Sequence, residues 1–143
     1  MFLYFDTNHA IQIHDWIIEN SGGRPGVFNI GNLQSPLEHV KNDDYYPTIE
    51  DKLNFLVYSI NKNHAFNDGN KRSSIALGAY FLKLNGYHYA VSGFVSNMEN
   101  IAVWVADNII DRALLSELIT SMIYEDEFSE ALKIKLLTSI SCM

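Results

Sequence analysis

The chain has 143 residues, 48% of them hydrophobic, which is enough for one compact domain with an apolar core. Its formal net charge of −7 argues against nucleic acid as the main ligand, because phosphate backbones attract basic surfaces. The one cysteine, Cys142, excludes a disulfide framework and a cysteine zinc cluster within the chain.

The N-terminal residues "MFLYFDTNHA" lack the pattern of a signal peptide, and no apolar run is long enough to span a membrane. We therefore expect a soluble cytoplasmic protein with a single domain, residues 1–143. A first helix is predicted to begin at Thr7, an N-cap residue, with His14 buried in a structural role on its apolar face. "GGRPGVFNIGN" is typical of a glycine-rich connection. Pro36 is expected to open a short helix that ends at Val40, followed by an exposed loop.

The next helix is predicted to begin at Thr48, because Thr48 and Asp51 have the spacing of a capping box. Its apolar residues recur at i, i+3, i+4 and i+7, the spacing of one buried stripe: Leu53, Leu56, Val57 and Ile60. Residues 75–84 are apolar almost all round, which indicates a central helix. Asn85 and the glycine after it end that helix.

Residues 87–95 are compatible with a short strand or a loop, and their brief alternation does not decide between the two. The rest of the chain has helical spacing, and we expect the last helix over Phe128–Ile140. Trp16 and Trp104 are interpreted as packing residues. The pattern predicts an all-α fold of six or seven helices with little sheet.

The polar run from Asn61 to Ser74, "NKNHAFNDGNKRSS", interrupts two apolar helical patterns. Since a helix N-terminus has unpaired N–H groups and a partial positive charge, the start of the central helix is a potential anion site. Gly69 permits a tight turn and close approach of a ligand to the backbone. The side chains that follow add hydrogen-bond donors suited to phosphate: Asn70, Lys71 and Arg72.

An acid and a histidine complete this candidate site. Asp68 is a potential Mg²⁺ ligand, because Mg²⁺ takes few protein carboxylates when it also binds phosphates. His64 is a potential base that removes a proton from an attacking hydroxyl, and Phe66 between them is expected to point into the core. The alternative is a plain solvated turn between two helices, for which "NDGN" is also suitable.

At "HAFNDGNKR" the sequence resembles the Fic/Doc family, whose signature reads H-x-F-x-(D/E)-G-N-(G/K)-R. The specified positions are all matched: His64, Phe66, Asp68, Gly69, Asn70, Lys71 and Arg72. The resemblance extends through "IHDWIIENSGGRPGV", "YYPTIEDKLNFLVYSINKNHAF" and "RSSIALGAYFLKLNGY", over roughly the first ninety residues.

This resemblance implies an all-α fold in which the motif joins two central helices. It also implies transfer of part of a nucleoside triphosphate to a protein hydroxyl, with ATP and Mg²⁺ as cofactors. By position, His64 would be the base and Asp68 the Mg²⁺ ligand. The phosphate site would be lined by Gly69, Asn70, Lys71 and Arg72. The family's flap, which aligns the target segment, would fall near Pro36–Tyr46.

Two positions bear on the subtype. AMP-transferring members carry glycine where this chain has Lys71, and a second arginine where it has Ile75. Members with lysine and without that arginine resemble the Doc branch, which implies a toxin that transfers the γ-phosphate of ATP to elongation factor Tu and blocks translation. The alternatives are an AMP transferase of the same fold and a catalytically inactive binding module.

The resemblance also bears on regulation and partners. Ser121 and Glu125 have the spacing of the inhibitory helix that many Fic proteins contain, but Asp126 departs from its pattern, and ordinary helix packing is our interpretation. A chain without its own inhibitory helix implies a separate antitoxin protein as partner, together with the target protein. We expect no membrane and no direct nucleic-acid partner.

Overall fold

The computed structural model describes residues 1–142 and is all-α over that range, with one isolated bridge between Val27 and Phe66. The helices are α1 (Thr7–Ser21), α2 (Gly31–His39), α3 (Ile49–Lys62), α4 (Asn70–Leu84), α5 (His88–Ala106), α6 (Arg112–Tyr124) and α7 (Glu130–Ser141). None of these helices is long and apolar enough to cross a membrane.

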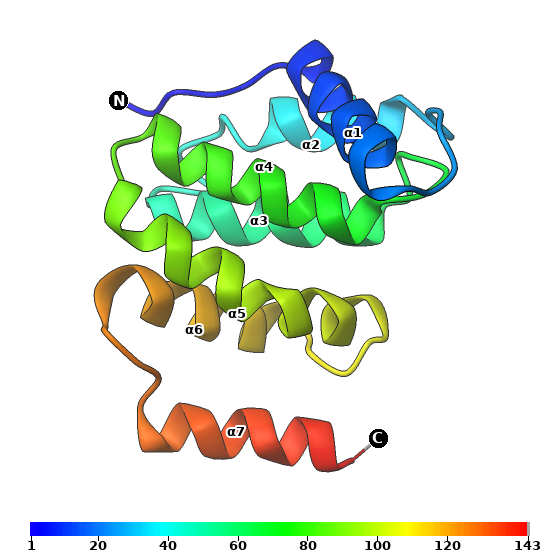
Figure 1. Cartoon of the computed structure of the whole chain (residues 1–143). Helices are drawn as coiled ribbons and strands as arrows, with labels where there is room; N and C mark the ends of the chain where they lie inside the picture. The colour runs from blue at the N-terminus through cyan, green and yellow to red at the C-terminus, as the bar shows by residue number, and fades with distance from the viewer. Residues whose placement is uncertain (143) are drawn as a thin grey trace.

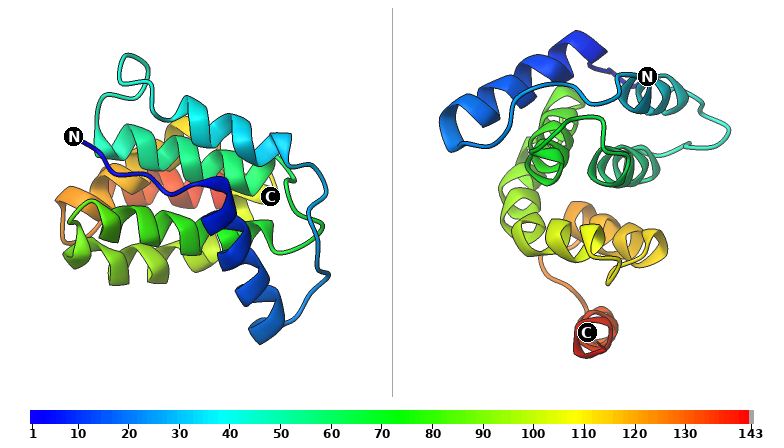
Figure 2. Two further views of the ribbon diagram at one scale, coloured as in Figure 1. Left: turned by 90° about the horizontal axis from the view of Figure 1, so that it is seen from above. Right: turned by 90° about the vertical axis from the view of Figure 1, so that its right-hand side faces the viewer.

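Helices α3, α4, α5 and α6 pack against one another and enclose most of the core. Helices α1 and α2 pack on α4 and α3 respectively, and α7 packs on α6 (Figure 1). The polar motif connects α3 to α4 at one end of this bundle, and the segment between α1 and α2 runs beside it (Figure 2, left). The prediction that the motif joins two central helices is confirmed.

The capping residues explain where the early helices begin. Thr48 is the N-cap of α3, and its hydroxyl accepts a hydrogen bond from the N–H of Asp51 at 3.2 Å. The predicted stripe of α3 is buried. Helix α1 begins one residue earlier than expected, because its N-cap is Asp6 and not Thr7: the carboxylate of Asp6 accepts from the N–H of His9 at 2.8 Å.

Helix α2 differs from its prediction. It begins at Gly31, so Pro36 lies inside the helix and does not open it. Leu33, Pro36 and Leu37 are buried on one face. Burial of this stripe outweighs the hydrogen bond that a proline cannot donate.

Helix α5 includes residues 88–95, which the sequence left between strand and loop. Ala90, Phe94 and Met98 are buried at intervals of four residues, so this segment is the first part of one long amphipathic helix. Its period was hidden because Gly93, next to a serine, interrupts the apolar pattern and is tolerated without breaking the helix.

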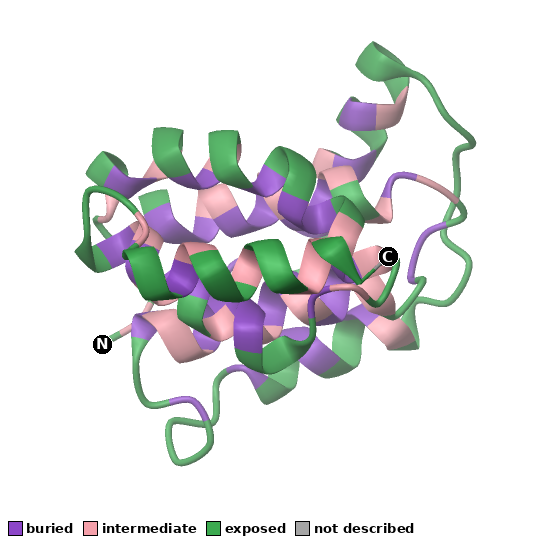
Figure 3. Ribbon diagram, turned by 90° about the horizontal axis from the view of Figure 1, so that it is seen from below, coloured by how far each residue is buried: buried purple, intermediate pink, exposed green. Residues whose placement is uncertain are grey.

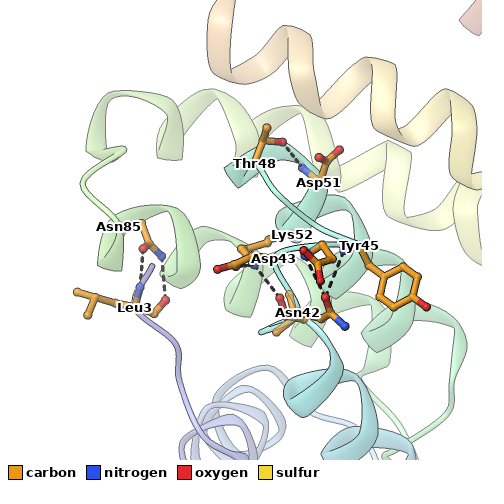
Figure 4. A network of polar contacts seen from close by, with 10 residues as sticks. Leu3, Asn42, Asp43, Tyr45, Thr48, Asp51, Lys52 and Asn85 are labelled. Atoms are coloured by element: carbon orange, nitrogen blue, oxygen red, sulfur yellow. Dashed lines mark hydrogen bonds and ion pairs between the residues drawn. The ribbon is translucent and has the colours of Figure 1, made fainter. Parts of the chain in front are cut away.

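Lys52 in α3 is a buried charge far from the motif. Its ammonium donates to the carbonyl of Val40 at 2.9 Å and to the carboxylate of Asp43 at 2.8 Å (Figure 4). The same ammonium lies over the rings of Phe2 and Tyr4, 4.9 and 5.6 Å from their centroids. Lys52 therefore joins the N-terminal segment and the loop after α2 to the start of α3.

The periphery is less well packed. Leu132 is the buried residue of α7, whereas Ile134 and Leu137 are exposed, and most of this helix faces solvent (Figure 3). Trp104 packs against the core as predicted, but the prediction for Trp16 is wrong, since its side chain is 63% exposed on α1. Trp104 shares its helical spacing with Ile101 and Val105, whereas Trp16 lies off the apolar face of α1 that contains His14.

Candidate active site

The motif loop between α3 and α4 is braced by Asn70. Its side-chain oxygen accepts from the N–H of Phe66 at 3.2 Å, and its side-chain nitrogen donates to the Phe66 carbonyl at 3.0 Å. Phe66 is 1% exposed, as predicted, while His64 is exposed and has a positive φ of 51°. The side-chain amide of Asn70 thus fixes the shape of the loop. The backbone N–H of Asn70, at the start of α4, remains for a ligand.

His14 supports the loop from α1. Its ring is stacked on that of Phe66, with 3.8 Å between centroids and 4° between planes. Its Nε2 lies 2.7 Å from the backbone carbonyl of Asp68, and it donates there because a carbonyl oxygen only accepts. The side chain is fully buried. The predicted structural role of His14 is confirmed.

Residues 24–29, here called the strap, run antiparallel to the motif loop. The N–H groups of Phe28 and Asn29 both donate to the Ala65 carbonyl, at 2.8 and 3.0 Å. The N–H of Asn67 donates to Gly26 at 3.1 Å. Gly26 has a φ of 103°, and a Cβ there would lie 2.8 Å from the side-chain nitrogen of Asn67, so only glycine fits.

This arrangement corrects the predicted position of the flap. Residues Pro36–Tyr46 form the end of α2 and the loop near the start of α3, whereas the motif follows the end of α3. The segment that pairs with the motif loop is the strap. The error arose because the glycine-rich run was interpreted as a connection and the exposed loop before Pro47 as the flap.

Asp68 is held from both sides. Its carboxylate accepts from the backbone N–H of Arg24 at 3.0 Å and from that of Gly69 at 2.8 Å. These two backbone hydrogen bonds, together with the charges of Arg72 and Arg24, lower the pKa of Asp68 below its ordinary value. Asp68 is therefore ionised at neutral pH, as a metal ligand must be.

Arg72 points back toward the end of α1. Its Nη1 donates to the hydroxyl of Ser21 and to the carbonyl of Gly22, both at 2.7 Å. A Cβ on Gly23 would lie 2.9 Å from Nη2 of Arg72 and 2.8 Å from the carboxylate of Asp68. Position 23 also has a φ of 126°, which residues with a side chain rarely adopt, so both its backbone conformation and this close approach favour glycine.

The N-terminus of α4 faces a cavity of about 220 Å³. Gly69, with a φ of 80°, is the N-cap, and the first N–H groups of a helix have no partner inside it. The cavity brings together six of the seven predicted residues, and three residues that sequence reasoning missed. It is lined by Asn61, His64, Asn67, Asp68, Gly69, Asn70, Lys71, Arg72 and Ala106.

The cavity fits the groups that the resemblance implies. Its residues include two cations, an ionised carboxylate and the positive end of a helix, which together suit a polyphosphate and one Mg²⁺. Its volume is below the roughly 300 to 1,000 Å³ of pockets that enclose drug-sized ligands. It therefore has the size for the phosphate part of a nucleotide rather than for all of it.

No group of three or more histidine, cysteine or carboxylate side chains within residues 1–142 has the geometry of an all-protein metal site. A site with one protein carboxylate is the kind in which Mg²⁺ obtains its other ligands from phosphates and water. Asp68 is the residue that could supply it.

Ser121 and Glu125, which match the inhibitory spacing in part, line a different cavity, between α6 and α7. Ser121 is 3% exposed on the inner side of α6. Its position agrees with the interpretation of ordinary helix packing.

The comparisons with known proteins agree with this geometry. The model of the Fic/DOC family matches residues 4–82. The chain is 35% identical over 94 residues to Toxin Doc of Mycolicibacterium smegmatis, which covers 63% of this chain and 72% of that protein. It is 32% identical over 87 residues to Protein kinase doc of Escherichia phage P1, and that match covers 58% of this chain and 68% of the phage protein. The matched range contains α1, the strap, α3 and the whole motif. The chain belongs to the Fic/DOC family.

Proposed function

We propose that this protein is a Mg²⁺-dependent phosphotransferase that moves the γ-phosphate of ATP to a hydroxyl of a target protein. The observation that carries the proposal is the single cavity in which the His64 ring, the Asp68 carboxylate and the N-terminus of α4 meet. The names of the two relatives, a toxin and a protein kinase, support the direction of the proposal.

Each residue has a role that follows from its position. His64 is exposed at the mouth of the cavity, where it would accept the proton of an incoming hydroxyl. The first backbone N–H groups of α4 and the side chains of Lys71 and Arg72 would bind the phosphates and orient them. Asp68 would hold Mg²⁺, which when bound supplies charge neutralisation to the phosphates.

The strap would hold the target segment. It is exposed throughout, and its Phe28 side chain is 69% exposed beside the motif loop. An extended peptide can add to such an edge through backbone hydrogen bonds. The apolar side chains of that peptide would then contact the exposed residues of the strap.

Kinase chemistry is preferred to AMP transfer for two reasons. Lys71 is exposed and lines the cavity, where its side chain takes space that a glycine would leave for the inner phosphates. Ile75, at the position of the second arginine, packs against the apolar core and adds no cation to the cavity. Lys71 and Ile75 both lie in α4, the helix that begins within the motif.

By analogy with the toxins in this family, the target would be elongation factor Tu, and modification would stop translation in the cytoplasm. A separate antitoxin protein would keep the enzyme inactive. These assignments rest on the relatives' names and on the resemblance of the motif.

The test is a transfer assay with ATP labelled on the α- or the γ-phosphate, with Mg²⁺ and purified elongation factor Tu or a bacterial lysate. Label that arrives from the γ-position alone is the expected result. Label from the α-position alone would make the protein an AMP transferase. No transfer with either label, while ATP still binds, would favour an inactive binding module.

His64→Ala is expected to abolish transfer and leave ATP affinity within about tenfold, roughly 1.4 kcal/mol, because the base acts on the hydroxyl and not on the nucleotide. His88→Ala is the matched control, since His88 is exposed at the start of α5, outside the cavity. Full transfer by His64→Ala would exclude the proposed base.

A further inference from the structure

Two polar residues at the end of α3, immediately before the motif, bind the C-terminal end of α5. The side-chain nitrogen of Asn61 donates to the Ala102 carbonyl at 2.9 Å. The ammonium of Lys62 donates to the carbonyls of Val105 and Ala106, both at 3.3 Å, and to the side-chain oxygen of Asn108. These contacts, here called the α5 clamp, join segments more than forty residues apart.

The α5 clamp has a clear physical basis. The last carbonyls of a helix have no N–H partner within it, and they form the negative end of the helix dipole. The ammonium of Lys62 supplies both hydrogen-bond donors and a positive charge at that end. Asn108 follows the helix with a positive φ of 62°, a conformation in which its side chain reaches the same ammonium.

The clamped end of α5 is a wall of the cavity. Ala106 lines the cavity together with Asn61, and Lys62 is two residues before His64 in the chain. The α5 clamp therefore links this wall directly to the residues that precede the motif loop. Residues 88–106 lie outside the range that the family model matches.

We infer that Lys62 is a positioning residue of this site: it fixes the end of α5 as the wall that determines how much space the phosphates have beside His64. The identity of the ligand rests on the proposed function, whereas the coupling between wall and loop does not. Lys62 itself does not line the cavity and acts through Ala106.

Amide hydrogen exchange of the unliganded protein tests the coupling. In Lys62→Met we expect protection to fall about tenfold both at residues 107–109 and at the motif amides of residues 66–69. Lys62→Arg, which keeps the positive charge and the hydrogen-bond donors, should retain most of the wild-type protection at both places. Lys83→Met is the matched control, because Lys83 is an exposed lysine in the last turn of α4.

A second variant tests the same coupling in case Lys62→Met folds poorly. Asn108→Gly keeps the positive φ and removes the oxygen that accepts from Lys62, so a smaller loss at both places is expected. Loss confined to residues 107–109, with the motif amides as in the wild type, would show that the α5 clamp stabilises α5 alone. If Lys83→Met lost as much amide protection at residues 107–109 and 66–69 as Lys62→Met, the inference would also be overturned.

Kinetics then separate positioning from stability. Lys62→Met should raise the KM for ATP about tenfold and change kcat little, with recovery in Lys62→Arg. A variant that was merely less stable would lose kcat in proportion to its folded fraction and keep its KM. If the wild type transferred nothing, the proposed function would fail, while the exchange measurements would still decide the coupling.

Discussion

Asp68 has two kinds of partner in the motif. Its carboxylate accepts from the N–H groups of Arg24 and Gly69, so it fastens the strap and the turn before α4. The same carboxylate is the one that could bind Mg²⁺. These hydrogen bonds favour the charged form and lower its pKa, and the loop is therefore held best at the pH at which a metal would bind.

The lowered pKa of Asp68 predicts a dependence of stability on pH. Its contribution is fully present above the ordinary pKa of 3.8 and is lost as the pH falls through the lower folded-state value. The difference in unfolding free energy between the wild type and Asp68→Asn should be constant from pH 7 to about pH 5 and should shrink below 3.8.

Urea unfolding across this range measures that difference. Asp44→Asn, at an exposed acid in the loop after α2, is the control. A difference that stays constant down to the lowest pH would show that the two backbone hydrogen bonds do not distinguish the charged from the neutral carboxyl.

Single residues were predictable where their local pattern was sufficient. Phe66 was placed correctly because it is the one large apolar side chain in a polar run, and His14 because it lies on an apolar face of its helix. Arg24 and Lys62 were missed because their partners are more than forty residues away. Hydrogen bonds of that range leave no periodic signal in one sequence.

Among the elements, the long amphipathic helices followed from their apolar spacing, and α3 and α4 were predicted almost completely. The starts of α2 and α5 were not, since proline and glycine obscured the period. The pairing of the strap with the motif loop could not be predicted from spacing, because it consists of backbone hydrogen bonds from residues without a repeating pattern.

The end of α5 gives a prediction that concerns an element outside the motif. Ala106→Leu should weaken the binding of Mg²⁺-ATP by about tenfold or more, because a larger side chain would occupy a cavity of about 220 Å³. Leucine is a good helix former, so the fold should persist.

Isothermal titration calorimetry measures this binding. The matched control is Ala113→Leu, at an exposed position of α6 away from the motif. Unchanged affinity in Ala106→Leu would place the phosphates elsewhere.

At the scale of the molecule, α3 separates two polar centres. A helix of 14 residues is roughly 20 Å long at 1.5 Å per residue. The motif follows one end, and Lys52 with Asp43 lies near the other. Most of the buried residues of α3 between them are apolar, so stability and chemistry are expected to be separable.

Lys52→Ala tests this separation. It removes a buried cation and leaves a cavity beneath the N-terminal segment, so we expect a loss of about 3 kcal/mol in unfolding free energy. Lys52→Met, which keeps most of the volume, should lose about 1 kcal/mol. Transfer per folded molecule should remain at the wild-type rate in both variants.

Chemical unfolding and the γ-label assay on the same preparations measure the two quantities. A drop of about tenfold or more in transfer by the folded variants would show that the two polar centres are coupled and that stability and chemistry are not separable.

The location of Cys142 has a practical consequence. It is the one cysteine in the sequence, it is exposed, and it follows α7, which packs on α6 and not on the helices that carry the motif. A thiol-reactive dye or surface would therefore attach at one defined point without any substitution. Because the sequence holds no second thiol that would compete for the reagent, the protein could be immobilised or labelled for single-molecule work in its natural sequence.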